Sequence, residues 1–363
     1  MNSKVENRIA IDKIVETHPI NFPDPLGFGR IFSDRMFIQR FSSEQGWHDA
    51  AITAYQQLSL DPASTVFHNG QMIFDGTKAY RSPNGDINLF RPQMNVDRFN
   101  LSAERMGMPT VDPSFHLEAI KKLVKLEQKW VPDKPGTALY IRPTMISSEK
   151  NIEVRASREY LHFIILTPVA PYFAEGFEPV AVAVSENYIR STPGGTGEAK
   201  TPGNYAGSIA ATEKAIKDGY QQVLWLDGQQ KKYVDEVGAM NIAFVKRNGD
   251  IVSPSLTGAI LRGVTRDSLT TLAPSLGHKF IECRISIDEV VAGLDAGNIS
   301  EIFGMGTGAV IAPVGRLLYK DREIIVSDGK PGPVATKLYK ELTSLQYGTK
   351  RDPFDWIDTI KLS

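Results

Sequence analysis

The sequence predicts an α+β fold in two domains, on three observations. At 363 residues the chain is long for one domain and sufficient for two. Hairpin signals and helical periodicity are mixed along it, instead of alternating strictly as strand and helix do around a parallel sheet. Three prolines and a glycine between residues 168 and 179 interrupt regular structure. We therefore expect domains over 1–170 and 181–363, joined by a linker over 171–180.

Short strands and two helices are expected in the N-terminal half. Asn69-Gly70 is a tight-turn pair between the apolar runs 66–68 and 73–74, so we expect a hairpin there, with a longer loop as the alternative. β-branched and aromatic residues predict strands over 35–41, 137–146 and 160–166. Apolar residues at helical spacing predict helices over 96–106 and 113–130.

The C-terminal half carries clearer signals. Asn248-Gly249 lies between two apolar runs and is a good hairpin signal. Ser286 with Glu289 three residues later matches a capping box, which opens a short helix. Helices are expected over 206–218, 258–272, 286–294 and 331–345. Strands are expected over 180–184, 223–226, 242–245 and 250–252.

Composition excludes several classes of protein. Hydrophobic residues make up 42% and charged residues 23%, as in folded globular chains rather than disordered ones. Lys+Arg (41) balance Asp+Glu (42), so the basic excess of a nucleic-acid binder is missing. The single cysteine, Cys283, rules out an intrachain disulfide. No apolar run approaches the ~20 residues of a membrane span, and the charged N-terminus does not match a secretory signal. We expect a cytoplasmic protein.

Two glycine-rich stretches imitate nucleotide motifs without meeting their requirements. The first, 194–201, is similar to a phosphate loop, but Ala199 stands at its second glycine and Pro202 follows where a helix with free amides is needed. The second, 304–309, imitates a dinucleotide fingerprint, but Pro313 interrupts the helix that must follow. Both can still bind a phosphate through convergent backbone N–H groups. The six histidines show no metal-ligand spacing, so no metal site is expected.

Within the first of these stretches, Lys200 has an unusual setting. Three glycines precede it and Pro202-Gly203 follow, which lets backbone pack closely around its side chain. A lysine attacks carbonyls only when its amine is deprotonated, and desolvation or nearby positive charge favours that state. The alternative is a solvated loop lysine, which is the usual state of a lysine. The local sequence by itself favours that alternative.

Several blocks of sequence favour a reactive Lys200 over a solvated loop lysine. The segment 194–205, followed by Asp235-Glu236-Val237-Gly238-Ala239-Met240-Asn241, resembles the branched-chain aminotransferases of the fold-type IV pyridoxal-phosphate family. Further blocks stand in the family's order, and together they cover the chain from about residue 28 to the C-terminus: 90–98, 139–143, 260–266 and 301–314. The resemblance implies a two-domain fold like that of D-amino acid aminotransferase. Its N-terminal domain would be small and α/β, its C-terminal domain larger and rich in strands, and its active site would lie at the domain interface.

The implied activity is reversible transamination between leucine, isoleucine or valine and 2-oxoglutarate, with pyridoxal phosphate as cofactor. Its place would be the synthesis or the breakdown of branched-chain amino acids. The alternatives are another fold-type IV activity, namely a D-amino acid aminotransferase or an aminodeoxychorismate lyase, and a non-catalytic scaffold that has kept the fold. The resemblance extends into both domains, which disfavours the lyase. A scaffold would not require Lys200, Glu236, Tyr205 and Arg98 together.

The resemblance also assigns the cofactor residues. Lys200 would hold the cofactor as an aldimine and then move a proton at the substrate Cα. Glu236 would keep the pyridine nitrogen protonated, and Tyr205 would hydrogen-bond the phenolic oxygen. The phosphate would meet a guanidinium, a hydroxyl and the amides of a helix N-terminus, supplied by Arg98, Thr307, Val264 and Thr265. Arg190 is a further candidate, with a surface charge as the alternative.

The implied substrate pocket must accept an apolar side chain and then the carboxylate of glutamate, which is costly to bury unpaired. Tyr140 and Arg142 would bind that carboxylate at the rim of an apolar lining. The lining positions are Phe28, Phe74, Tyr140, Tyr172 and Ala239. The α-carboxylate would lie against Ala239 and the Thr307-Gly308 turn. Ile152 and Val154 match a loop that reaches the partner subunit's site, so the resemblance implies a homodimer.

The sequence departs from the family's pattern in three places. Asn69 stands where a pocket tyrosine is usual, which makes that wall smaller and more polar. Asp75 stands where glutamate is common. Ala309 and Ala312 replace a Cys-x-x-Cys pair of animal members, so a thiol switch is excluded there.

Overall fold

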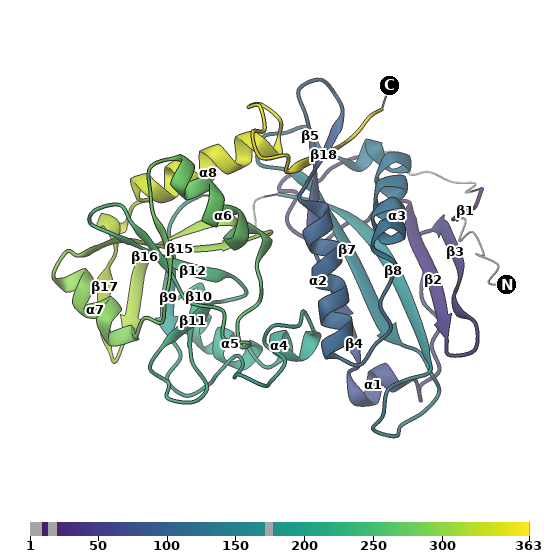
Figure 1. Ribbon diagram of the computed structural model, residues 1–363, viewed down its shortest axis with the longest axis horizontal. Helices are drawn as coiled ribbons and strands as arrows, with labels where there is room; N and C mark the ends of the chain where they lie inside the picture. Colours follow the sequence, from purple (N-terminus) through teal and green to yellow (C-terminus); the bar gives the residue numbers. More distant parts are fainter. Residues whose placement is uncertain (1–8, 14–19, 171–176, 363) are drawn as a thin grey trace. The chain divides into compact units, whose positions relative to one another are not determined.

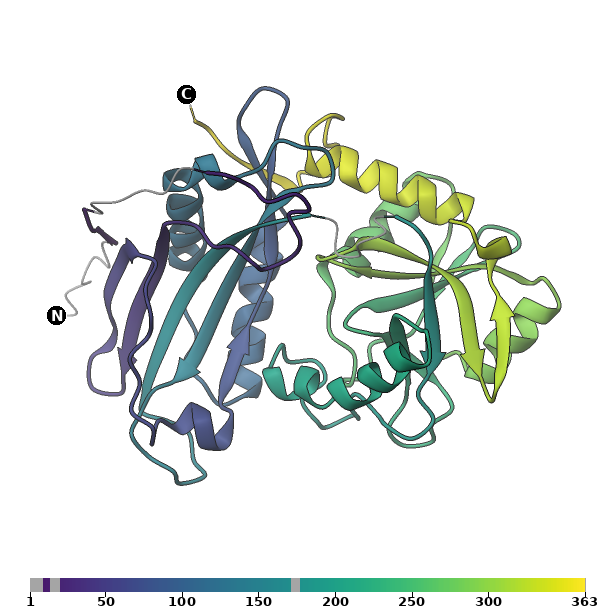
Figure 2. The same ribbon diagram turned by 180° about the vertical axis from the view of Figure 1, so that it is seen from behind.

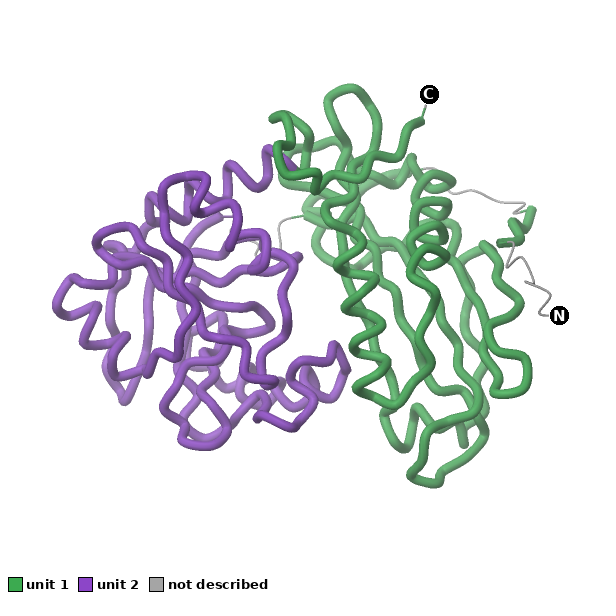
Figure 3. Tube along the Cα trace, in the orientation of Figure 1, with its two compact units in different colours: residues 1–170, 346–363 green, residues 171–345 purple. Residues whose placement is uncertain are grey.

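The computed structural model describes residues 9–13, 20–170 and 177–362. The chain divides into two compact units, of which unit 1 comprises residues 1–170 and 346–363 and unit 2 comprises residues 171–345 (Figure 3). The first segment of unit 1 ends at residue 170, and residues 346–363 group with that segment rather than with unit 2.

Unit 1 is a sheet with two longer helices packed on one face (Figures 1 and 2). Its described strands follow the order β1-β3-β2-β8-β7-β5-β6-β18, with β4 paired to β7. Every pair is antiparallel except β1 with β3. The strands are β1 (Ala10–Ile11), β2 (Arg35–Ser42), β3 (Gly46–Ala54), β4 (Met72–Phe74), β5 (Thr77–Arg81), β6 (Ile87–Phe90), β7 (Ala138–Ser147), β8 (Glu159–Val169) and β18 (Ile357–Ile360). The α-helices are α1 (Thr65–Asn69), α2 (Pro92–Arg105) and α3 (Pro113–Leu126).

Helix α3 confirms the helical periodicity read from the sequence. Asp112 caps its N-terminus by accepting a hydrogen bond from the Phe115 amide at 2.8 Å. Ile120 and Leu123 lie on its buried face, within a core that also contains Leu139 of β7. Burial of this apolar stripe against the sheet holds the helix in place, because an isolated helix of this length is marginal in water.

Helix α1 shows that the hairpin expected at Asn69-Gly70 is wrong. The segment before that pair is helical, and Gly70 ends the helix with φ at +62°, its amide donating to the Val66 carbonyl. The start of the helix is held from elsewhere in the chain. Both the amide and the hydroxyl of Thr65 donate to the Glu149 carbonyl, at 2.9 and 3.1 Å. This long-range anchor has no counterpart in the local sequence.

Strand β18 explains why the C-terminal segment belongs to unit 1. It pairs antiparallel with β6, with Ile360 opposite Ile87. Lys121 on α3 forms an ion pair with Asp358 at 2.7 Å. The backbone ladder covers the outer edge of β6, which would otherwise be open to pairing with other chains.

Unit 2 is a mixed sheet whose described strands follow the order β11-β10-β9-β16-β15-β12-β13-β14, with β17 paired to β16. The strands are β9 (Val180–Val184), β10 (Gln222–Leu226), β11 (Val234–Val237), β12 (Asn241–Lys246), β13 (Ile251–Ser253), β14 (Phe280–Glu282), β15 (Ile299–Gly306), β16 (Val310–Tyr319) and β17 (Arg322–Ile325). The helices are α4 (Pro202–Ala206), α5 (Ile209–Lys217), α6 (Val264–Ser275), α7 (Ile287–Asp295) and α8 (Pro333–Gln346).

Two local predictions for unit 2 are confirmed and one is wrong in extent. The Ser286–Glu289 capping box opens α7 with both reciprocal hydrogen bonds present. β12 and β13 form the hairpin expected around residues 248–249. Helix α6 begins at Val264, six residues later than expected, because Gly258 has φ at +83° and the chain stays irregular up to the N-cap.

Among the described residues, no helix is long and apolar enough to cross a membrane. In the same part of the chain, no group of three or more His, Cys, Asp or Glu side chains is arranged to hold a metal ion.

Two buried histidines lie in contact inside unit 1. The ring centroids of His116 on α3 and His162 on β8 are 4.8 Å apart. Gln39 contacts Nδ1 of His162 at 2.9 Å, whereas neither ring nitrogen of His116 has a hydrogen-bond partner in the described part of the chain. Burial lowers the pKa of His116 to about 4 and that of His162 well below its usual range.

This pair predicts acid sensitivity. The unfolded chain binds protons at histidine below pH ~6.5, while the folded chain keeps both rings neutral, so stability falls as pH drops from ~6.5 towards ~4. Each ring contributes up to ~1.4 kcal/mol per pH unit in this window. Urea unfolding between pH 7 and 4.5 should therefore show a shallower pH dependence for His116→Leu than for the unmodified protein. His68→Leu, at an exposed position, is the control. Parallel curves for all three proteins would contradict the expectation.

Candidate active site

Lys200 lies at the end of the glycine-rich segment, just before α4. Asn204 on α4 pins this segment by donating to the carbonyls of Thr196 and Ala199, at 2.7 and 2.9 Å. At Gly197 a Cβ would lie 2.1 Å from the Ala259 carbonyl oxygen, so only glycine fits there. The segment is therefore fixed by specific contacts, and Lys200 is half-buried rather than on a free loop.

Tyr205 faces Lys200 from α4. The Nζ atom of Lys200 donates to the Tyr205 hydroxyl at 3.0 Å. Burial alone would raise the pKa of Tyr205, but the charge and hydrogen bond of Lys200, aided by the charge of Arg190, lower it overall. The amine of Lys200 thus lies beside the Tyr205 phenol, whose lowered pKa favours a positive charge next to it.

Glu236 on β11 is the buried carboxylate of the site, with 2% of its surface exposed. Its Oε1 accepts a hydrogen bond from Asn241 at 3.0 Å. Arg190 Nη1 lies 2.6 Å from Oε2, yet Oε2 receives no hydrogen bond of regular geometry within the described part of the chain. Burial raises the pKa of Glu236, against the opposing charges of Arg190 and Lys200. Glu236 therefore keeps an oxygen that can accept a further proton-bearing group.

Arg190 is a buried side chain and not the surface charge that the sequence left as its alternative. Its side chain is 6% exposed, and it donates to the Ala259 carbonyl at 3.2 Å as well as pairing with Glu236. Asn241 ties Glu236 to the segment before α6, because its amide also donates to the Leu261 carbonyl at 2.9 Å.

The N-terminus of α6 lies next to this cluster. Gly263 is its N-cap, and a Cβ there would lie 2.0 Å from Asn241 Oδ1, so glycine permits the approach. Val264 and Thr265 form the first helical positions and are both buried. The amides of a first helical turn have no partner within the helix and carry partial positive charge, which suits an anion.

Thr307 and Gly308 follow β15, whose Met305 pairs with Asn241 at the start of β12. Gly306, the last residue of β15, approaches Met240, which immediately follows Ala239. Unit 2 thus brings Lys200, Tyr205, Arg190 and Glu236 together, and its sheet register places the 307–308 turn at the end of the sheet where β12 begins.

Arg98 lies on α2 of unit 1, where Asp75 holds it. Its Nε and Nη2 donate to the two carboxylate oxygens of Asp75, at 2.9 and 2.8 Å, and both side chains are buried. Asn95 and the Gly76 amide also donate to Asp75. The bidentate contact fixes the plane of the guanidinium.

Four of the expected pocket residues also meet in unit 1. The ring centroids of Phe28 and Tyr140 are 5.1 Å apart. The guanidinium of Arg142 lies 4.8 Å from the centre of the Phe74 ring and 5.2 Å from that of Tyr140. At Gly76 a Cβ would lie 1.8 Å from the Tyr140 hydroxyl, so the backbone makes room for the ring. The group presents apolar rings beside one cation.

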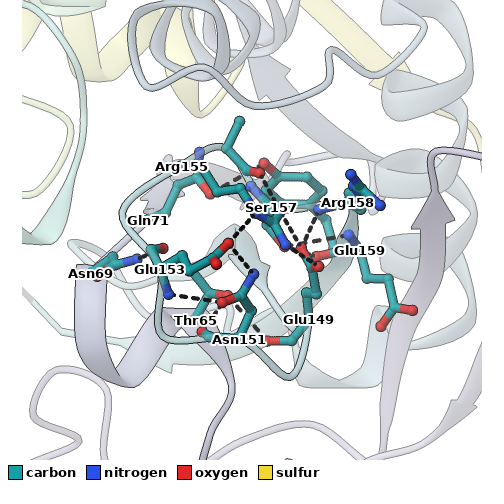
Figure 4. Close-up of polar contacts among 12 residues, drawn as sticks. Thr65, Asn69, Gln71, Glu149, Asn151, Glu153, Arg155, Ser157, Arg158 and Glu159 are labelled. Atoms are coloured by element: carbon teal, nitrogen blue, oxygen red, sulfur yellow. Dashed lines mark hydrogen bonds and ion pairs between the residues drawn. The ribbon is translucent and has the colours of Figure 1, made fainter.

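Ile152 and Val154 lie on the loop between β7 and β8. They are 66% and 92% exposed. Asn69 donates from Nδ2 to the Glu153 carbonyl between them, at 2.7 Å, so its amide holds this loop (Figure 4). Tyr172 lies outside the described residues.

Comparison with known proteins identifies the class. The family model of amino-transferase class IV matches residues 72–317. The crystal structure of the Escherichia coli branched-chain amino acid aminotransferase has the same fold, with a TM-score of 0.75 at 24% identity over 90% of this chain and 99% of that one. The Thermobaculum terrenum branched-chain amino acid aminotransferase, in its holo form with pyridoxal phosphate, superposes with a TM-score of 0.73 at 22% identity, over 90% and 98% of the two chains. The chain is therefore a class IV aminotransferase.

Two curated relatives narrow this class. Branched-chain-amino-acid transaminase 1 of Bacillus subtilis (strain 168) is 49% identical over 92% of this chain and 94% of its own length. A probable branched-chain-amino-acid aminotransferase of Staphylococcus aureus (strain N315) is 45% identical over 97% of both chains. The chain belongs to the branched-chain aminotransferase family. Its reaction is transamination, and its cofactor is pyridoxal phosphate.

The residues present fit that cofactor. Glu236 has an acceptor oxygen for a protonated pyridine nitrogen, and the amine of Lys200 is held beside Tyr205. The start of α6 supplies amides for a phosphate. This donor set offers a carboxylate, an amine and an anion site, which are the three kinds of group the cofactor requires.

Three residues that hold the site were missed as functional positions by sequence reasoning. Asp75 holds Arg98, Asn241 holds Glu236, and Asn204 holds the segment before Lys200. Asn204 and Asn241 lie within the blocks 194–205 and 235–241, and Asp75 is one of the departures from the family's pattern, but a motif does not say which neighbour a side chain contacts. Only Asn204 carried a local signal, because it directly follows Pro202-Gly203 at a helix start.

Proposed function

We propose that the chain transfers the α-amino group between L-leucine, L-isoleucine or L-valine and 2-oxoglutarate, with Lys200 as its catalytic residue. The contact of Lys200 with Tyr205, in the unit that also buries Glu236 against Arg190, carries this proposal. The names of relatives 45–49% identical to the chain support the branched-chain substrates.

Pyridoxal phosphate, when bound, supplies an electron sink for the electrons of the bond broken at the substrate Cα. In our proposal the Lys200 amine takes the proton from the substrate Cα and would pass it to the cofactor, and in the reverse half-reaction it would carry a proton back to Cα. Glu236 holds a proton at the pyridine nitrogen through Oε2, the oxygen that also forms the ion pair with Arg190. Tyr205 donates to the phenolic oxygen.

The phosphate is assigned to two kinds of group. The amides of Val264 and Thr265 at the start of α6 bind it directly, together with the hydroxyl of Thr307. Arg98 and Arg190 add positive charge. Asp75 keeps the guanidinium of Arg98 in a fixed orientation for this role.

The substrate side chain is assigned to the group of rings around Arg142. Phe28 and Phe74 accept an apolar side chain, and Arg142 with Tyr140 binds the carboxylate of glutamate. The α-carboxylate lies against Ala239 and Gly308. Tyr172 remains a prediction for the same lining. A cytoplasmic location is also proposed, and the single cysteine supports it.

A homodimer completes the proposal. In it, Ile152 and Val154 of one subunit contact the substrate side chain in the other. Their exposure supports this role, because apolar side chains displayed at a loop tip are available to a partner.

The visible absorption spectrum tests the function directly. The protein loaded with pyridoxal phosphate should lose its absorption band when L-leucine is added and regain it with 2-oxoglutarate. D-leucine is the control and should leave the band unchanged. A band that responds to D-leucine only, or to neither isomer, would contradict the proposal.

Arg142→Ala should separate the two substrates. We expect the specificity constant for glutamate to fall about a hundredfold, because a buried carboxylate loses its charged partner, while that for leucine changes less than about threefold. Steady-state kinetics in both directions measure the difference. Arg158→Ala, an exposed arginine elsewhere in unit 1, is the control. Equal losses for both substrates would contradict this role.

A further inference from the structure

The loop at residues 148–158 combines exposed apolar side chains with an unusually well fixed backbone. Ile152 and Val154 bury little surface of their own, with exposed fractions of 66% and 92%. Apolar burial therefore does not hold this loop. Its conformation depends on polar contacts, which Figure 4 shows on both sides of the tip.

The first set of contacts is an ion-pair network within the loop. Arg155 makes a bidentate contact with Glu149, at 2.7 and 3.1 Å, and its Nε donates to Glu153 at 3.1 Å. Glu149 also accepts the amide of Arg158 at 2.7 Å. The hydrogen bond from Arg155 lowers the pKa of Glu149 to about 2, so this carboxylate stays charged at any working pH. An isolated ion pair at the surface contributes little to stability, but a bidentate pair that also accepts a backbone amide fixes the conformation of the loop.

The second set joins the loop to α1. The Thr65 hydroxyl donates to the carbonyls of Glu149 and Asn151, at 3.1 and 3.0 Å. Asn69 donates to the carbonyl of Glu153 at 2.7 Å. Ile152 thus lies between two anchored residues, at 151 and 153, and Val154 lies between residue 153 and Arg155.

A third contact ties the end of the loop to the body of unit 1. Gln71 accepts the Ser157 amide at 3.1 Å and the Tyr160 hydroxyl at 3.2 Å. Its own amide donates to the Met106 carbonyl, just after α2, at 3.0 Å. The loop is therefore continuous with the folded core through polar contacts at its start, its tip and its end.

We propose that Asn69, Glu149 and Arg155 are positioning residues, which hold Ile152 and Val154 in the one arrangement that contacts an apolar substrate side chain. This inference rests on the proposed function, in which the loop serves the site of a second copy of the chain. Asn69 positions the loop through the hydrogen bond of its side-chain amide, and not by forming a wall of the pocket. A loop fixed before binding loses less conformational entropy when the substrate arrives.

The expected signature is a change in leucine recognition rather than in chemistry. Arg155→Met removes the ion-pair network and should raise the KM for leucine about fivefold. The kcat and the KM for glutamate should change less than about twofold, because glutamate binds through its carboxylate. Asn69→Ala should act in the same direction through an independent contact. Arg158→Met is the matched control, because it removes the same charge from a side chain that forms no hydrogen bond or ion pair in the described part of the chain.

Mixed dimers of the holoenzyme test where the loop acts. A Lys200→Ala subunit with an intact loop is paired with an Arg155→Met subunit, so that only the latter has a working lysine. The leucine KM of this mixed dimer should return to the wild-type value. A KM that stays raised would overturn the action of the loop on a second copy.

Two further outcomes are decisive. If Arg155→Met and Asn69→Ala both fold, by circular dichroism and melting temperature, and keep the wild-type leucine KM, the positioning role is wrong. If both variants raise the KM for leucine and glutamate equally, the loop acts on overall structure and the inference also fails. Failure of the proposed function would differ from either, because the unmodified protein would then not transaminate leucine at all.

Discussion

Replacing Lys200 by alanine is expected to reduce transamination of leucine by at least about a thousandfold, because the change removes both the nucleophile and the base. Tyr205 and Glu236 remain in place but provide no amine. Initial rates of 2-oxoglutarate consumption, with circular dichroism to confirm folding, measure the effect.

Lys214→Ala is the matched control for this variant. Lys214 lies on α5 in the same unit, and its exposed side chain pairs with Asp218, one helical turn further along, at 2.7 Å. We expect its rates to equal those of the unmodified protein. If Lys200→Ala kept a tenth of the wild-type rate, another group would have to act as the base, and the central role of Lys200 would be wrong.

Asp75→Asn is expected to destabilise unit 1 by about 3–5 kcal/mol, because it removes the countercharge from the buried guanidinium of Arg98. The substitution keeps the shape of the side chain, so the loss reports charge and hydrogen bonding rather than packing. Asn95 and the Gly76 amide would face an altered acceptor as well.

Urea unfolding followed by tryptophan fluorescence is suited to this measurement, because three of the four tryptophans lie in unit 1. Glu118→Gln, which breaks the exposed Lys122 pair on α3, is the control and should change stability by less than about 0.5 kcal/mol. An unchanged midpoint for Asp75→Asn would show that the buried pair does not stabilise unit 1.

Much of the fold could be predicted because its signals are local. The Ser286–Glu289 capping box and the apolar stripe of α3 each lie within one helix and depend on no distant residue. Helix α1 was not predictable in the same way. Its sequence favours a turn at Asn69-Gly70, and the contact that fixes its start comes from Glu149, far along the chain.

In the candidate site, too, the features with a sequence signal could be predicted, and those that depend on long-range contacts could not. Lys200 could be singled out from its glycine-rich context together with the distant blocks of the family. The partners that hold the site could not, because a hydrogen bond such as that of Asn241 with Glu236 depends on how two strands meet. For Arg190 the sequence left a site residue and a surface charge equally open, and only the fold shows that its side chain is buried against Glu236.

The pairing of β18 with β6 affects the order in which the two units can fold during synthesis. Unit 1 is encoded by two separated segments, whereas unit 2 is one continuous stretch between them. As the chain leaves the ribosome, unit 2 can complete its sheet while the edge of β6 still awaits the last strand. The nascent N-terminal sheet is thus exposed to mispairing until β18 has been synthesised. Early release of the chain would therefore damage the unit that is translated first.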